Sequence, residues 1–307
     1  MDFFVTFNQI LILFMLLLVG FITRKLNIVD ASFSKNLSNF LFNITLPAMI
    51  IHGMNHSFSA EILTNGVWLI VISLGILAFS YVVAVLAVKW LKVDNLSRNI
   101  YQFGIMFSNF GFMGYPVVEA LFGEEGILYV SMFSIPIHFL FNSLGIMVIK
   151  RGESNSVKME PENVINPPFL ATIAGLFIFV FSLKIPEPIT MSIKMIGSTT
   201  TPLSMILSGL ILANARPNEL FSNYKVYIVS FIRLIFLPVI VLFILKAFHL
   251  NLLMIGIPVV ITAMPVAANA SILAEKYDGN AYLGAQSVFI STLLSVLTIP
   301  IIAYFIA

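Results

Sequence analysis

Long stretches without a charged residue constrain this chain more than any other feature of its sequence. Nine stretches contain no Asp, Glu, Lys or Arg, and a tenth is interrupted only by Arg233. The ten stretches are residues 3–23, 36–60, 62–88, 99–118, 126–149, 163–183, 195–215, 226–245, 247–274 and 279–307. A helix that crosses the hydrocarbon of a bilayer needs about 20 mostly apolar residues. The sequence therefore predicts an all-α integral membrane protein with about ten transmembrane helices.

The composition leaves no room for a soluble domain. Charged residues make up 10% of the 307 residues, against about 25% in soluble domains. The net charge of +2 is too small to indicate a nucleic-acid partner, so the lipid bilayer is the expected surrounding. The chain has no cysteine, which excludes thiolate metal sites. We expect neither a metal nor an organic cofactor, because the sequence contains no pattern that would hold one.

Basic residues are distributed unevenly between the loops. If successive helices alternate in direction, twelve basic residues fall on one side of the membrane and three on the other. The twelve are Arg24, Lys25, Lys35, Lys89, Lys92, Arg98, Lys150, Arg151, Lys158, Arg216, Lys225 and Lys276, and the three are Lys184, Lys194 and Lys246. Cytoplasmic loops carry an excess of Lys and Arg. We therefore expect a multi-pass protein of the plasma (inner) membrane with both termini non-cytoplasmic and the central linker, residues 151–162, in the cytoplasm.

The two halves of the chain share landmarks at an offset of 155 residues. Gly20 then falls on Gly175, and Pro47 falls on Pro202. Each half contains five of the predicted helices, and an odd number makes the second half enter the membrane from the opposite side. Inverted repeats of this kind are common in transporters. The alternative is a chance similarity between apolar helices.

The fourth and ninth predicted helices each combine proline with Asn, Ser and small residues. Asn109 precedes Pro116 in the fourth helix, and Asn269 follows Pro265 in the ninth. A break in such a helix exposes free N–H groups at the start of its second half, where an anion is stabilised. The alternative is a proline kink whose polar groups bond neighbouring helices. We favour the kink for the prolines of the second and seventh helices.

These motifs resemble the auxin efflux carrier family, which includes plant PIN proteins and bacterial organic-acid permeases. The fourth helix has Asn109, three residues, Met113-Gly114, one residue and Pro116, as in the plant pattern. The ninth helix has Pro265 twelve residues before Tyr277, which is similar to a second pattern of the family. The resemblance extends over the whole ten-helix layout.

The resemblance implies a fold similar to that of the bile-acid/sodium symporters, with helices four and nine crossing at their breaks. Residues 1–60 and 163–215 would form a scaffold, and residues 61–150 and 216–307 a transport domain, joined by the linker 151–162. The transport domain would move past the scaffold in an elevator mechanism, and helices 2 and 7 would form a homodimer.

The resemblance also implies that a small carboxylate binds at the crossing, with help from the Asn of the fourth helix. That role falls on Asn109, with Pro116 and Pro265 shaping the breaks, and the expected substrate-binding residues are in all Asn109, Gly111, Gly114, Pro116, Pro265 and Asn269. The chain departs from the plant members in its uncharged third helix, its short central loop, and Glu119 in place of an expected basic residue. The expected substrate is therefore a small organic anion rather than auxin.

Three ionisable residues are candidates for ion coupling or for substrate charge. Arg233 either binds substrate or extends its side chain to the cytoplasmic interface, and we favour the interface. Glu119 and Glu275 either carry a coupling proton or anchor a helix end at the interface, and again we favour the interface.

Two other classes of function stay open from the residues alone. An anion channel is one, although no known selectivity-filter sequence or acidic ring is present. An intramembrane enzyme is the other, and it is disfavoured because the sequence has no His-Glu-x-x-His or Gly-x-Ser-x-Gly motif. We therefore expect a secondary transporter and no enzyme.

Overall fold

The computed structural model describes residues 3–150, 165–213, 221, 223–277 and 279–306. Within these ranges the chain is helical, with no strand beyond one isolated bridge. Seven helices are long and apolar enough to cross a membrane, and Pro167–Phe181 and Leu252–Ala263 are shorter apolar helices. The prediction of an all-helical multi-pass membrane protein is confirmed. The predicted linker 151–162 lies outside the described residues.

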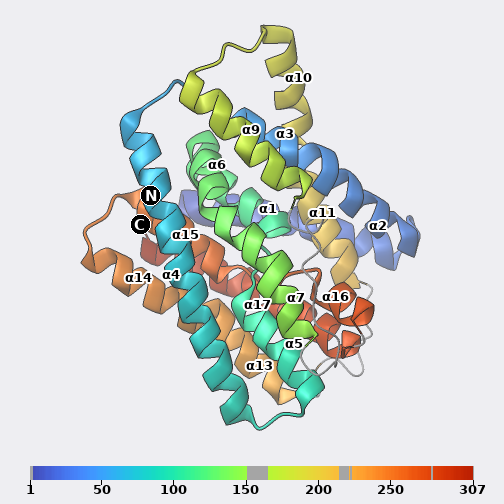
Figure 1. The fold of residues 1–307 in the computed structure, drawn as a ribbon. Helices are drawn as coiled ribbons and strands as arrows, with labels where there is room; N and C mark the ends of the chain where they lie inside the picture. Colours follow the sequence, from blue (N-terminus) through green and yellow to red (C-terminus); the bar gives the residue numbers. More distant parts are fainter. Residues whose placement is uncertain (1–2, 151–164, 214–220, 222, 278, 307) are drawn as a thin grey trace.

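The first half of the chain forms helices that correspond to the first five uncharged stretches (Figure 1). They are α1 (Phe3–Lys25), α2 (Ala31–Phe40), α3 (Leu46–Met54), α4 (Ala60–Leu91), α5 (Asn95–Met106), α6 (Tyr115–Leu140) and α7 (Ile146–Ile149). A kink at Gly123, with φ 66° and ψ −155°, divides α6 beside the acidic residues between two uncharged stretches. Glycine is favoured there because it has no Cβ to clash at positive φ.

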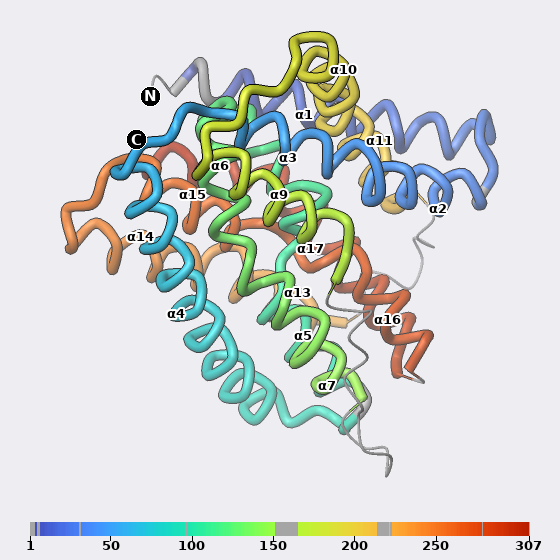
Figure 2. The backbone as a smooth tube through the Cα atoms, turned by 45° about the horizontal axis from the view of Figure 1, so that its top comes forward, coloured from blue at the N-terminus to red at the C-terminus, as the bar shows by residue number. Residues whose placement is uncertain are grey.

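The second half of the chain contributes the other described helices. They are α9 (Pro167–Phe181), α10 (Glu187–Ser198), α11 (Thr200–Ala213), α13 (Tyr224–Phe231), α14 (Leu237–Ala247), α15 (Leu252–Ala263), α16 (Ala270–Lys276) and α17 (Ala281–Ile306). The start of α1 and the end of α17 lie near one another in both overall views (Figures 1 and 2).

Proline explains where several helices are irregular. Pro47, Pro116 and Pro238 are each the second residue of the helix that follows a π-helical turn. Proline removes one N–H and clashes with the preceding turn, and a wider turn accommodates this. Pro47 therefore produces an irregular turn within a continuous helix. At Pro202 the interruption is only Thr199, which keeps helical backbone angles between α10 and α11.

The longest helix shows which solvent surrounds the bundle. The 32 residues of α4 expose Val67, Trp68, Val71, Val82 and Leu86. Soluble monomers rarely expose contiguous apolar surface on this scale. These side chains fit the hydrocarbon of a bilayer, in agreement with the multi-pass assignment.

The helices pack as two groups that meet along one interface. In the first helix group, α1 packs on α11, and α3 packs on α9 and α10, with α2 continuing into α3. In the second helix group, which contains α4 to α7 and α13 to α17, α6 packs on α4 and α15, and α17 packs on α15 and α16. The interface runs between α3, α11 and α1 on one side and α6 and α17 on the other.

Glycines bring the helices of the first group into backbone contact. A Cβ on Gly20 would lie 2.0 Å from the carbonyl oxygen of Ile206, and one on Gly209 would lie 1.9 Å from that of Leu17. Only glycine fits at both positions, so α1 and α11 cross at van der Waals distance. Small residues allow close approach of helices in membranes.

Candidate functional site

The breaks of the fourth and ninth predicted helices lie against each other. The N–H of Asn109 donates to the carbonyl of Pro265 at 2.8 Å, and the N–H of Ala267 donates to that of Phe107 at 3.2 Å. Ser108 and Val266 form an antiparallel bridge between these two bonds. Each break therefore satisfies part of the backbone of the other, as backbone outside a helix must be satisfied at membrane depth. Below, the crossing means residues 107–109 together with 264–269.

Arg233 holds the crossing together from inside the protein. Its side chain is only 3% exposed. The guanidinium donates to the carbonyls of Ile105 at 3.0 Å, Met264 at 3.2 Å and Ile261 at 3.4 Å. The last carbonyls of a helix have no partner within it, and here the planar fork of one arginine serves the ends of both α5 and α15. The interpretation that Arg233 extends to the interface was wrong, because these buried carbonyls attract the guanidinium more than water does.

Asn109 acts within its own helix. Its Oδ1 accepts a hydrogen bond from the N–H of Phe112 at 3.4 Å, so it caps the segment that leads into α6. The corresponding position before α16 is Asn269, whose side chain makes no such capping bond. The amide of Asn269 is therefore the one left free for a ligand. Since α16 has only seven residues, side chains must supply most of the charge compensation there.

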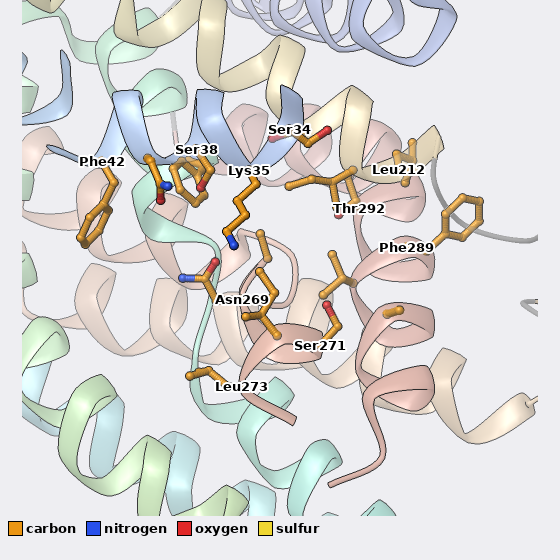
Figure 3. A pocket seen from close by; sticks show the side chains of 18 residues that line it. Ser34, Lys35, Ser38, Phe42, Leu212, Asn269, Ser271, Leu273, Phe289 and Thr292 are labelled. Atoms are coloured by element: carbon orange, nitrogen blue, oxygen red, sulfur yellow. The ribbon is translucent and has the colours of Figure 1, made fainter. Parts of the chain in front are cut away.

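A cavity of about 670 Å³ lies beside the crossing. It is bounded by α2, α11, α16 and α17, and by Phe112 from the crossing side (Figure 3). Its polar lining residues are Ser34, Lys35, Ser38, Asn39, Ser208, Asn269, Ser271 and Thr292. Apolar side chains such as Val288 and Phe289 form the rest of the wall. None of the described residues that line it is acidic.

Lys35, an exposed residue of α2, supplies the positive charge among the described lining of this cavity. Figure 3 shows its side chain extending from α2 toward the amide of Asn269. Within the described part of the chain Lys35 forms neither an ion pair nor a hydrogen bond. The carboxylate of Asp30, one turn earlier, accepts from the Ser32 hydroxyl at 2.8 Å and from the N–H of Phe33 at 2.9 Å. An ammonium group and a free amide thus face each other across the cavity.

Of the six residues expected to bind substrate, the structure places only Asn269 on the cavity wall. The other five lie at or behind the crossing. Gly114 is packed so that a Cβ would lie 2.7 Å from Ile261, and Pro116 follows the π-helical turn. Pro265 accepts the bond from Asn109, while Gly111 is half-buried with open space around it. Substrate contact by these five stays a prediction.

Sequence reasoning missed Lys35 as a site residue because it was counted only as a loop charge. A signal was present, since Ser34, Lys35 and Ser38 follow each other at helical spacing where the uncharged stretch begins. Residues three or four apart share a helix face. A polar face on a helix at membrane depth indicates a cavity or a polar neighbour.

The other end of the interface carries acidic residues. Glu119 is half-buried and accepts a hydrogen bond from the hydroxyl of Thr201. Glu124 pairs with both His52 and Lys194 at 3.2 Å. These contacts connect α6 to α3, α10 and α11, around a cavity of only about 60 Å³. Below, the outer cluster means His52, Glu119, Glu124, Lys194 and Thr201. Glu275, by contrast, is exposed on α16.

Comparison with known proteins places the whole chain among transporters. A relative from Methanocaldococcus jannaschii, named as an uncharacterized transporter, is 28% identical over 302 residues, which cover 96% of each chain. One from Methanothermobacter thermautotrophicus with the same description is 25% identical over 298 residues, again 96% of each. An uncharacterized transporter of Escherichia coli is 25% identical over 206 residues, 63% of each.

The model of the family described as "membrane transport protein" matches residues 5–303. It covers both broken helices and Lys35, so the crossing and the cavity fall within the matched region. The resemblance drawn from the motifs around Pro116 and Pro265 is therefore confirmed at the level of the family. The chain belongs to the membrane transport protein family, that of the PIN-like auxin efflux carriers.

Proposed function

We propose that this protein is a secondary transporter of small organic anions that binds a carboxylate in the cavity between Lys35 and Asn269. One observation carries the proposal: within the described part of the chain, the ammonium group of Lys35 and the side-chain amide of Asn269 have no partner, and the described lining of the cavity holds no acidic residue. A carboxylate that is taken out of water is costly unless several donors compensate it. Each charge-assisted hydrogen bond contributes about 1.5–3 kcal/mol.

The crossing adds to this charge arrangement. Helix ends that point their carbonyls inward carry a negative partial charge, which repels an anion. The guanidinium of Arg233 compensates those ends of α5 and α15. Among the described residues that line the cavity, Lys35 adds a positive charge and none is acidic. The residual field beside Asn269 therefore favours a negative ligand.

The walls of the cavity favour an organic ligand over an inorganic ion. Its volume of about 670 Å³ lies within the range of roughly 300–1,000 Å³ typical of small-molecule sites. Phe112, Val288 and Phe289 offer apolar surface that a chloride ion would not use. This supports a carrier of small organic acids over an anion channel.

The packing of glycines supports an inverted repeat. Gly20 of α1 packs on Ile206 of α11, and Gly175 of α9 packs on Met54 of α3. The offset of 155 residues relates Gly20 to Gly175, α1 to α9 and α3 to α11, so the two glycines pack on corresponding helices. Two halves that pack through equivalent helices in this way suit alternating access around a shared site.

We propose that the first helix group is the scaffold, residues 1–60 and 163–215, and that the second is the transport domain, residues 61–150 and 216–307. In this elevator arrangement the crossing travels with the transport domain. The second and seventh predicted helices, which correspond to α2–α3 and α10–α11, would join two scaffolds in a homodimer. The cavity would open to the cytoplasm of a plasma-membrane protein.

Uptake into proteoliposomes tests the proposal. A panel of radiolabelled benzoate, lactate, malate and malonate is offered to the wild-type protein, with and without the same unlabelled acid inside. We expect saturable uptake and counterflow for at least one acid, and loss of affinity in Asn269→Ala. Asn43→Ala is the matched control, because Asn43 is exposed and lies outside the cavity. Uptake that does not saturate, or that requires an organic cation, would overturn the proposal.

A further inference from the structure

We propose that Lys35 binds the substrate on one side of the membrane only, so that the protein has a higher affinity for its anion on the side where Lys35 lies. This inference rests on the proposed function, since it assigns a side to the site described there. It concerns two groups on opposite walls of one cavity, Lys35 on α2 and Asn269 next to α16 (Figure 3).

Lys35 is fixed to the first helix group. Helix α2 starts at the Asp30 cap and runs through the π-helical turn into α3. Helix α3 is held in turn against α10, where a Cβ on Gly197 would lie 2.9 Å from the backbone of Met49. This backbone contact leaves α3 no room to slide without losing its packing. The cation of the cavity is therefore attached to helices that pack closely on one another.

Asn269 is fixed to the second helix group. It belongs to the crossing, which is tied together by the bond between Asn109 and Pro265 and by the buried guanidinium of Arg233. The start of α16 also packs tightly on α17, because a Cβ on Gly284 would lie 2.9 Å from Ser271. A ligand held by Asn269 therefore moves with the second group.

A carboxylate in the cavity contacts both groups only in the arrangement seen here. If the second group shifts along the interface to open the outer cluster, the amide of Asn269 and its ligand move away from Lys35. The ligand then keeps the donors of the crossing and loses one ammonium group. A charge that contacts the substrate in one state alone makes affinity differ between the two sides.

The test measures the Michaelis constant from each side of the membrane. Inverted and right-side-out vesicles are prepared and distinguished by the single variants Ser32→Cys and Ser57→Cys. Ser32 lies at the start of α2, and Ser57 lies just after the end of α3, which continues from α2. The probe is whichever of benzoate, lactate, malate and malonate the wild-type protein transports. The variants are Lys35→Gln, which removes the charge, and Lys35→Arg, which keeps it. Lys25→Gln is the matched control, because Lys25 lies near the same loop and outside the cavity.

We expect Lys35→Gln to raise the Michaelis constant about ten- to a hundred-fold on the side of Ser32. On the side of Ser57 the constant should stay at its wild-type value. Lys35→Arg should retain most of the affinity, and Lys25→Gln should behave as wild type from both sides.

Equal increases on both sides would overturn the inference, and so would no change on either side. If Lys35→Gln leaves both constants unchanged while Asn269→Ala raises both, the proposed function stands and this inference fails. If the wild-type protein transports none of the four acids, the proposed function fails and the inference falls with it.

Discussion

The interface between the two helix groups differs between its two ends. At one end α2 and α11 stand apart from α16 and α17 around about 670 Å³ of space, where Lys35 has no partner among the residues that the structure describes. At the other end the outer cluster joins α6 to α3, α10 and α11 around about 60 Å³. A single interface that is open at one end and closed at the other suits one state of an alternating-access carrier. A conducting pore would need a path past both ends.

The closed end is held by weak contacts. The side chains of Glu124 and Lys194 are each half exposed, and exposed ion pairs contribute about 0–1 kcal/mol. The buried crossing, by contrast, gathers several hydrogen bonds from Arg233. The contrast indicates that the crossing is held more strongly than the outer cluster, and under the proposed function the outer cluster is the part that would open. The predictions below test this difference.

Arg233→Met should have the largest effect. It removes the side-chain donor from the carbonyls of Ile105 and Met264, and each unsatisfied buried group costs about 1–3 kcal/mol. We expect a large fall in melting temperature and loss of transport. Arg98→Met, which removes an exposed arginine from the start of α5, should change neither. A well-folded, active Arg233→Met protein would show that the crossing does not depend on the guanidinium.

Gly209→Ala should have the next largest effect. Its Cβ would lie 1.9 Å from a backbone oxygen of α1, so the two helices must separate. We expect a clear loss of thermal stability, because packed helices cannot absorb such an overlap without losing contacts. Gly75→Ala is the control, since no heavy atom lies within 4 Å of its added Cβ. It should be neutral or slightly stabilising, as Ala favours a helix by about 1 kcal/mol over Gly. Equal melting temperatures for the two variants would contradict the close crossing of α1 and α11.

Asn269→Ala and Asn109→Ala should separate affinity from stability. Loss of the Asn269 amide removes a donor from the cavity, so the dissociation constant should rise roughly ten-fold or more. Loss of the Asn109 side chain removes the acceptor for the N–H of Phe112, which caps the segment that leads into α6. This costs about 1 kcal/mol of stability and should affect binding less than the loss of Asn269. Binding and melting curves on both purified variants give the comparison. The reverse pattern would restore the sequence-based prediction that Asn109 is the main donor.

Glu124→Gln should have the smallest effect. It weakens the pairs with His52 and Lys194 and shifts the protein toward opening at the outer cluster, by less than about ten-fold given the small energy of exposed pairs. A cysteine at the buried Ile127, which lines the small cavity, reports opening through its rate of labelling. The rate should rise in Glu124→Gln and stay unchanged in Glu125→Gln. A rise in both variants would point to general loss of charge rather than to the pair.

The sequence predicts an all-helical membrane protein well, because uncharged stretches depend on local composition, but of about ten predicted spans the described residues form seven long apolar helices and two shorter ones. Uncharged stretches gave their positions, and Asn109, Pro116 and Pro265 marked the two breaks that the structure brings together. The partners of Arg233 could not be predicted, since the carbonyls that accept from its guanidinium lie 28 to 128 residues away in the chain. Lys35 was missed because a count of loop charges treats all basic residues alike. Which asparagine caps a helix and which stays free depends on backbone angles that no spacing reveals.

Direct binding of a carboxylate to the purified protein tests the central claim most closely. Melting temperatures are measured in detergent with benzoate, lactate, malate or malonate, and with organic amines of similar size. Ligand at about 100 times its dissociation constant stabilises the folded state by about 2.7 kcal/mol. We predict a rise in melting temperature with at least one acid, which disappears when Lys35→Gln and Asn269→Ala are combined. Stabilisation by the amines alone, or a carboxylate shift that survives in the double variant, would contradict the account.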